Sequence, residues 1–271
     1  VGASTAASTS LENIIEAAQG NAWFQLYFSG NEEMSDALLD RAKSAGYETL
    51  VLTVDVPEVG RRPRELRRGF TMPFKIGTQQ FIDFACHPRW SISSLLAGRP
   101  ELANFGGQFG EFDRTASRAG ADWSLLSRLR DKWHGKLVVK GVLSVEDALK
   151  IKAAGVDAIQ VSSHGGRQLD SAPAPIEVLS AIRESVGADY PLFYDSGIRS
   201  GEDIVKAYAK GADYVLIGRP FLFAISAAGE AGLQALKTVL AQETSIALAQ
   251  LGVCKMTQVN ESVLYQSQPV S

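Results

Sequence analysis

Two stretches in the second half of this sequence are copies of one another. Residues 144–162 read SVEDALKIKAAGVDAIQVS, and residues 200–218 read SGEDIVKAYAKGADYVLIG. In both copies a Ser followed by acidic residues predicts a helix start, and a Gly predicts the helix end before an apolar strand. Residues 42–54 are a weaker third copy. Repeated helix–strand units of this kind are typical of a parallel α/β fold.

Short apolar segments rich in β-branched residues fit buried parallel strands, which are covered on both faces and therefore read as near-continuous apolar runs. They are residues 23–28, 49–54, 137–140, 158–162, 191–194 and 214–217. Residues 1–4 fit the tail of a seventh strand, and no eighth is visible. We therefore expect an α/β fold, a (β/α)8 TIM barrel that is N-terminally incomplete and shows about six full strands. A doubly wound sheet is the alternative, because periodicity alone cannot show that a sheet closes.

The chain length of 271 residues fits one α/β barrel of roughly 250 residues, so we expect a single domain over residues 1–271. The strand–helix repeat is interrupted at 56–120, directly after the segment 49–54. Barrel active sites and lids are built on segments that follow strands. We therefore predict a lid insertion over 56–120, after strand 4 when the absent first strand is counted.

Composition excludes several classes of function. A net charge of −3 gives no indication of a nucleic-acid partner. The two cysteines, Cys86 and Cys254, lie far apart and show no metal-ligand spacing, so we predict no metal site and a reducing, cytoplasmic location. No apolar run approaches the roughly 18 residues that span a bilayer. The chain shows no signal peptide and opens with Val1, which is expected of a processed or truncated piece.

The densest group of polar residues is SSHGGRQLD at 162–170, directly after a predicted strand. His164 can accept a proton near neutral pH, and Arg167 can bind a carboxylate through two parallel hydrogen bonds. A turn with a solvated His and Arg is the alternative interpretation. Among the three histidines, only His164 follows a predicted strand.

A second group follows the last two predicted strands. It comprises DSGIRSG at 195–201 and IGRP at 217–220. Glycine-rich turns expose backbone N–H groups, helices begin directly afterwards, and Arg199 and Arg219 add positive charge. Together these features predict the phosphate site that barrels build after strands seven and eight. Two ordinary strand–helix turns are the alternative.

Single polar residues mark the ends of the other strands. Gln25 and Tyr27 alternate and therefore face one side of their strand, as do Thr53 and Asp55. Lys140 ends an apolar strand, which suggests that it meets an anion. These residues are expected at one rim of the barrel.

The segments WFQLY, LTVDVP, VVKGV, SSHGGRQLD, YDSGIRSGEDI and GADYVLIGRP, in this order, resemble the family of FMN-dependent α-hydroxy acid dehydrogenases and oxidases, which includes L-lactate dehydrogenase, glycolate oxidase and mandelate dehydrogenase. The resemblance covers essentially the whole chain. Ser163 stands where the family usually has Asn before the histidine. The family also carries a longer N-terminal segment that includes the first barrel strand, so the resemblance implies that this chain lacks it.

The resemblance implies a role for each matched residue. The implied catalytic residues are His164 as the base, Asp55 as its orienting partner, Tyr27, and Lys140 beside the flavin. The implied substrate-binding residues are Tyr27, Arg62, His164 and Arg167. The implied FMN-binding residues are Ser4, Gln25, Tyr27, Thr53, Lys140, Ser162, Asp195, Ser196, Gly197, Ile198, Arg199, Gly218 and Arg219.

The predicted activity is FMN-dependent oxidation of an L-2-hydroxy acid, such as lactate or mandelate, to the 2-oxo acid. Ala6 matches a position where the family can carry a bulky Trp, which predicts room for substrates larger than glycolate. Two alternatives stay open: a barrel lyase or isomerase that binds a phosphorylated substrate, and an inactive truncated barrel that acts only in assembly.

The resemblance further implies an electron acceptor, which can be oxygen, a quinone or a cytochrome, and a homo-oligomer, commonly a tetramer. Residues 58–90 interleave basic and aromatic side chains, a pattern found in peripheral membrane segments. This segment is therefore a candidate for peripheral contact with the inner face of the membrane, and a solvated active-site lid is the alternative.

Overall fold

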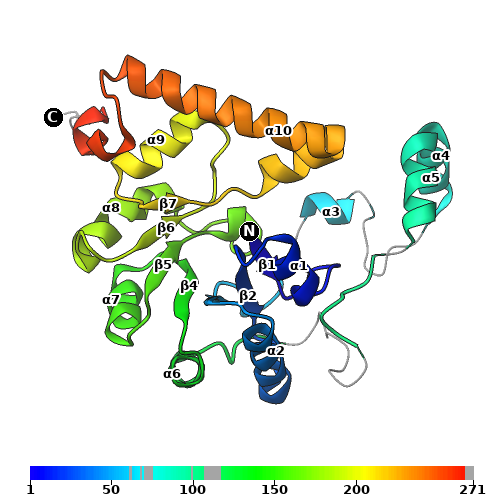
Figure 1. Ribbon diagram of the computed structural model, residues 1–271, viewed down its shortest axis with the longest axis horizontal. Helices are drawn as coiled ribbons and strands as arrows, with labels where there is room; N and C mark the ends of the chain where they lie inside the picture. The colour runs from blue at the N-terminus through cyan, green and yellow to red at the C-terminus, as the bar shows by residue number, and fades with distance from the viewer. Residues whose placement is uncertain (61–62, 68, 70–75, 99, 107–116, 266–271) are drawn as a thin grey trace.

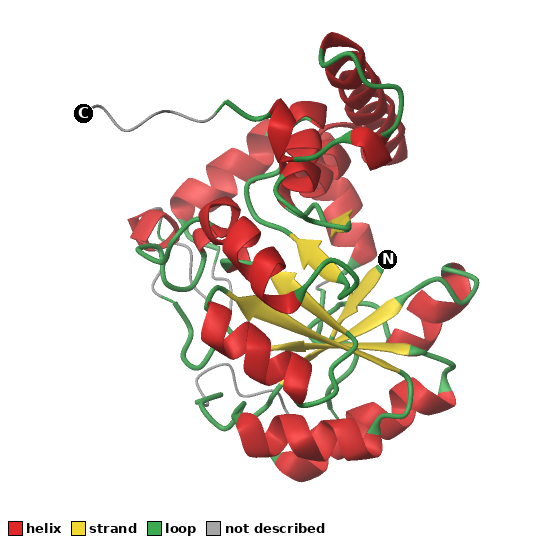
Figure 2. Ribbon diagram, turned by 90° about the vertical axis from the view of Figure 1, so that its left-hand side faces the viewer, coloured by secondary structure: helices red, strands yellow, loops and turns green. Residues whose placement is uncertain are grey.

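Seven parallel strands form one sheet in which strand order follows the sequence, and helices cover its outer face (Figures 1 and 2). The computed structural model describes residues 1–60, 63–67, 69, 76–98, 100–106 and 117–265. The strands are β1 (Gly2–Ser4), β2 (Trp23–Tyr27), β3 (Thr49–Thr53), β4 (Lys136–Val142), β5 (Ala158–Val161), β6 (Leu192–Tyr194) and β7 (Tyr214–Val215). The helices are α1 (Leu11–Ala17), α2 (Glu32–Ser44), α3 (Pro63–Arg67), α4 (Thr78–Cys86), α5 (Pro88–Ala97), α6 (Trp123–Lys132), α7 (Val145–Ala153), α8 (Pro175–Val186), α9 (Gly201–Ala209) and α10 (Arg219–Gln250). All six predicted strands are present, and residues 2–4 form the seventh.

The sheet curls until strands that are far apart in its order touch across its inner face. Trp23 of β2 stacks on Phe193 of β6 with ring centroids 5.4 Å apart, and lies 6.1 Å from the ring of Tyr214 on β7. Val51 and Val138 pack in the same inner layer. A flat sheet would keep β2 and β7 several strand spacings apart, so the curl excludes the doubly wound alternative and fits an incomplete barrel.

Alternation along the strands sends one set of side chains into the barrel and the other toward the helices. On β3, Leu50 and Leu52 are fully buried in the main core, whereas Val51 faces inward and Thr53 lies above it, nearer the carboxyl end of the strand. The inner face is therefore apolar at the bottom and polar toward the carboxyl ends of the strands.

The repeated glycines end helices as the sequence predicts. Gly46, Gly155 and Gly211 have φ values of 93°, 74° and 101°, a left-handed backbone that favours glycine after a helix C-terminus. Ser144 and Ser200 cap α7 and α9 by accepting the amides of Asp147 and Asp203. The repeat thus encodes both helix boundaries.

The predicted lid region holds α3, α4 and α5 between β3 and β4, which is the expected place after the fourth barrel strand. Helices α4 and α5 pack on each other and project away from the sheet (Figure 1). Both lack buried side chains, and Leu95 and Leu96 of α5 are 82% and 83% exposed. In the part of the chain that the structure describes, no helix is long and apolar enough to cross a membrane.

Candidate active site

A cavity of about 400 Å³ opens at the carboxyl ends of the strands, a size within the usual range for small-molecule sites. Every strand contributes a residue at or just beyond its carboxyl end, because the ends of parallel strands meet at one rim of the barrel. Of the predicted residues, those lining the cavity are Ser4, Gln25, Tyr27, Thr53, Lys140, His164, Arg167, Asp195, Ser196, Gly197, Ile198, Arg199, Gly218 and Arg219. The structure therefore brings residues that were predicted from the sequence, and that come from seven strands, into one cavity.

Four residues singled out in the sequence are not among the described residues of this lining. Asp55 and Ser162 lie behind the lining and contact it through His164 and Lys140. Arg62 lies outside the described residues. Ala6 follows β1, where its amide donates to the Ser4 hydroxyl, and is not among the described residues that line the cavity.

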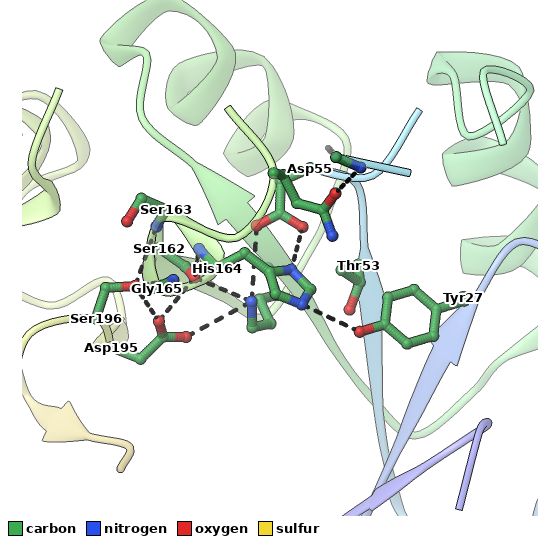
Figure 3. Close-up of polar contacts among 12 residues, drawn as sticks. Tyr27, Thr53, Asp55, Ser162, Ser163, His164, Gly165, Asp195 and Ser196 are labelled. Atoms are coloured by element: carbon green, nitrogen blue, oxygen red, sulfur yellow. Dashed lines mark hydrogen bonds and ion pairs between the residues drawn. The ribbon is translucent and has the colours of Figure 1, made fainter. Parts of the chain in front are cut away.

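His164 is held between a carboxylate and a phenol (Figure 3). Its Nδ1 lies 2.9 Å from Asp55 Oδ1, and its Nε2 lies 3.3 Å from the hydroxyl of Tyr27. An ionised carboxylate only accepts hydrogen bonds, so the Asp55 contact keeps the proton on Nδ1 and leaves the Nε2 lone pair toward Tyr27 and the cavity. This arrangement lets His164 act as a base on a group bound there.

Lys140 lies on the floor of the site between two carboxylates. Its Nζ is 3.7 Å from Asp55 Oδ2 and 3.7 Å from Asp195 Oδ2, and it donates to the Ser162 hydroxyl at 2.9 Å. The side chain is only 16% exposed. Two carboxylates therefore pair with this buried side chain at the floor of the cavity.

A polar chain crosses the strands beside it. Gln25 Nε2 donates to Thr53 Oγ1 at 2.8 Å, while the Ser4 hydroxyl donates to Gln25 Oε1 at 3.0 Å. This chain leaves the amide of Gln25 with a fixed orientation at the cavity wall.

Three arginines converge on one end of the cavity. Burial, followed by the nearby guanidinium groups of Arg199 and Arg167, lowers the pKa of Arg219 below its ordinary value. Arg219 donates to the carbonyl of Gly165 at 2.8 Å, and the Arg199 guanidinium lies over the ring of Phe223 at 6.0 Å. Mutual repulsion among these cations favours bound anions at this end.

The two helix N-termini near these arginines differ. At α9, the Asp203 carboxylate accepts the Arg199 and Ser200 amides, and Glu243 of α10 accepts the Gly201 amide at 2.8 Å. At α10, the N-cap is Gly218 and no side chain caps the helix. The α10 end, between Arg199 and Arg219, is therefore the better position for a phosphate.

Sequence reasoning missed Gln160, a buried residue of β5 that lines the cavity and donates to Asp195 Oδ2. Its signal was present, because a polar residue two positions before Ser162 on an apolar strand faces inward as well. Gln168 was also missed: its Oε1 accepts the amide of Gly60 at 2.8 Å and ties the start of the lid region to the His164 loop. Nothing in the sequence pattern pairs these two positions.

Known proteins resemble this chain in sequence and in fold. A family model described as FMN-dependent dehydrogenase matches residues 1–266. The chain belongs to the FMN-dependent dehydrogenase family. It is 40% identical over 268 residues to (S)-mandelate dehydrogenase of Pseudomonas putida, covering 96% of this chain and 67% of that protein. It is 37% identical to a protein of Mycobacterium tuberculosis provisionally named as an L-lactate dehydrogenase, covering 95% of this chain and 63% of that protein.

Solved structures agree with the family assignment. The crystal structure of the monotopic membrane protein (S)-mandelate dehydrogenase aligns with a TM-score of 0.90 and 38% identity, covering 98% of this chain and 72% of that chain. Mandelate oxidase with benzoyl-formic acid aligns with a TM-score of 0.76 and 38% identity, covering 95% and 67%. These comparisons confirm the family, the barrel fold and the FMN cofactor that the sequence predicted. The chain spans about two thirds of the length of these relatives.

The residues present fit an FMN molecule. The cavity joins a polar floor with a buried cation, Lys140, to an uncapped helix N-terminus flanked by Arg199 and Arg219. Gly218 also leaves open space, since a Cβ built there meets nothing within 4 Å. FMN consists of a planar ring system and a phosphate tail. The ring matches the part of the cavity lined by apolar and polar side chains around Lys140, and the phosphate matches the cationic end at the start of α10.

Proposed function

We propose that this protein uses FMN to oxidise L-2-hydroxy acids, including aromatic ones such as (S)-mandelate, to the corresponding 2-oxo acids. The observation that carries the proposal is the His164 imidazole, whose Nε2 faces the cavity while Nδ1 is held by Asp55. A phosphate-binding lyase or isomerase could use such a base, but it would leave the combination of His164 with the carboxylate-binding Arg167 without a purpose. The relatives named (S)-mandelate dehydrogenase and mandelate oxidase support an aromatic substrate.

Each residue of the site has a definite task in this proposal. Arg167 binds the substrate carboxylate through parallel hydrogen bonds, and Tyr27 contacts the hydroxyl side of the substrate. His164 Nε2 takes a proton from the substrate, and Asp55 stabilises the imidazolium that forms. Arg199, Gly218 and Arg219 hold the FMN phosphate, and Lys140 lies beside the ring. When bound, FMN would accept the two electrons that the substrate gives up.

The test is anaerobic reduction of the FMN-loaded protein. We expect (S)-mandelate to bleach the visible flavin absorption, and the (R)-enantiomer to leave it unchanged. Glycolate should react more slowly than lactate or mandelate, because the relatives are named for those two larger acids. A protein that binds FMN but is bleached by none of these acids would contradict the proposal.

The α4–α5 pair supports a second proposal, that of contact with a membrane surface. Its exposed apolar side chains include Phe81, Trp90, Leu95 and Leu96, and it projects from the barrel (Figure 1). Large exposed apolar patches on otherwise soluble folds mark interaction sites, and amphipathic helices bury such faces at the lipid headgroup boundary. The (S)-mandelate dehydrogenase of known structure is named a monotopic membrane protein.

Co-sedimentation with anionic lipid vesicles tests this contact. The double variant Leu95→Asp and Leu96→Asp should abolish binding, whereas Leu149→Asp, on α7 and 45% exposed, should not. Equal loss in both variants would refute the assignment to the α4–α5 pair. The electron acceptor and a homo-tetrameric assembly remain predictions from the family.

A further inference from the structure

The turn that carries His164 has an unfavourable backbone. His164, Gly165 and Gly166 have φ values of 55°, 68° and 71°, so three consecutive residues are left-handed. Glycine adopts this region readily, but a residue with a Cβ does so only when its surroundings hold it there. The direction of the imidazole therefore depends on what fixes this turn.

Two serine hydroxyls accept the three successive amides of the turn (Figure 3). Ser196 Oγ accepts the amides of Ser163 and Gly165 at 3.2 and 3.0 Å, and Ser162 Oγ accepts the amide of His164 at 3.0 Å. Both hydroxyls donate to the same oxygen of Asp195, at 2.6 Å from Ser196 and 2.8 Å from Ser162. The Asp195 carboxylate thus directs the lone pairs of both serines toward the turn.

Ser196 itself lies in a strained position. Its φ is 81°, where glycine would cost less, and the Tyr194 hydroxyl donates to its carbonyl at 2.7 Å. A strained residue that persists next to a functional group is evidence for a role of its side chain. Apart from its donation to Asp195, the observed contacts of that side chain go to the His164 turn.

We propose that Ser196 is a positioning residue for His164, whose hydroxyl, oriented by Asp195, fixes the left-handed turn and so aims the imidazole at the substrate. The inference rests on the proposed function for the reaction that His164 serves, and it goes beyond the FMN contact that the family resemblance implies for Ser196. Ser196 comes from the loop after β6 and His164 from the loop after β5, so the base and the cofactor loop are built as one unit.

Two variants separate the hydroxyl from the backbone. Ser196→Ala removes the hydroxyl and keeps a Cβ at positive φ, whereas Ser196→Gly removes the hydroxyl and relieves the backbone. Both should lower kcat with saturating FMN by about 10- to 100-fold, with KM changed less, because small misplacements of a reacting group cost that much. Ser196→Gly should have the higher thermal midpoint of the two.

Amide hydrogen exchange in the FMN-free protein gives a readout that does not depend on catalysis. Exchange at Ser163 and Gly165 should accelerate about tenfold or more in both variants, because each amide loses its acceptor. Ser144→Ala is the control, since it removes a serine hydroxyl that accepts a backbone amide at the start of α7, and it should leave both this exchange and kcat unchanged.

The outcomes are distinguishable. If exchange at 163–165 is unchanged and the loss of activity follows a weaker FMN affinity, Ser196 is only a cofactor contact and the inference is wrong. Retained kcat in both variants would also overturn it. If the wild-type protein oxidises no 2-hydroxy acid while exchange still accelerates in the variants, the proposed function fails and the support of the turn by Ser196 stands.

Discussion

Replacing Asp55 with asparagine isolates the electrostatic contribution of the carboxylate behind His164. The side chain is 12% exposed, and Oδ1 lies 2.9 Å from Nδ1 of the imidazole. Its other oxygen, Oδ2, is buried without a hydrogen bond and lies 3.7 Å from Lys140 Nζ. Asp55→Asn keeps the shape of the side chain but removes the negative charge between two cationic groups, the ammonium of Lys140 and the imidazolium formed during reaction.

The size of the effect follows from the geometry. Two charges about 4 Å apart interact by about 4 kcal/mol at an effective dielectric constant of about 20. The replacement amide retains a hydrogen bond to Nδ1, which offsets about 1 kcal/mol of that loss. Since about 1.4 kcal/mol corresponds to a factor of ten, the rate of flavin reduction should fall by about 10² to 10³. FMN affinity should change little, because Asp55 does not line the cavity.

Anaerobic stopped-flow reduction by (S)-mandelate measures this rate directly. Asp40→Asn is the control, because Asp40 lies on α2 with a side chain 78% exposed and should leave the rate unchanged. If Asp55→Asn reduced its flavin at nearly the wild-type rate, Asp55 would not stabilise the imidazolium, and the role of His164 as the base would lose its main support.

Three further predictions concern binding and stability. Arg199→Ala should raise the FMN dissociation constant by about 10- to 100-fold, because the phosphate loses one charge-assisted hydrogen bond. Titration calorimetry measures this constant, and an unchanged value would show that the phosphate lies elsewhere. Arg183→Ala should lower the free energy of unfolding by about 3 kcal/mol, because four backbone carbonyls lose their donor, those of Gly187, Ala188, Tyr190 and Gly211. Urea titration measures this free energy, and a loss below about 1 kcal/mol would contradict the prediction. Burial alone raises the pKa of Asp157, but the Leu137 amide, Lys136 and Arg130 together lower it below the ordinary 3.8. A lowered carboxyl pKa stabilises the fold above the unfolded pKa and ceases to do so as the pH falls through the folded value, so Asp157→Asn should flatten the loss of stability below about pH 4. An equally steep loss in that variant would refute this assignment.

The strands were predictable because buried parallel strands are continuous apolar runs that tolerate few polar residues. The segment 49–54 became β3 (Thr49–Thr53), with pairing on both sides. The segment 214–217 became only Tyr214–Val215, because β7 is an edge strand of the described sheet and pairs with β6 alone. Hydropathy fixes where a strand lies, but its length depends on neighbours that the local sequence does not reveal.

Two parts of the molecule lay beyond sequence reasoning for physical reasons. The region 56–120 carries no repeat, and its helices α4 and α5 bury no side chains against the barrel, so no core pattern marks their position. The contacts of Asp195 with Ser162 and Ser196 depend on the close approach of two loops and on hydroxyl direction. Residue spacing predicts that such groups share a rim, but it does not predict which atom of one meets which atom of another.

The internal repeat divides the molecule between scaffold and site. Asp157 and Asp213 occupy the same repeat position, and each accepts both the amide of the preceding strand and an arginine from a preceding helix, Arg130 or Arg183. These contacts lie at the amino ends of the strands, the face of a barrel whose residues serve stability rather than catalysis. The copies diverge where their strands end: one continues into the left-handed turn of His164, and the other into the uncapped start of α10. Loops after strands add little to the core, so the same unit can end in a base at one position and in an anion site at another. The repeat therefore indicates the positions that hold the barrel together, and the points where it breaks down indicate where the chemistry is expected.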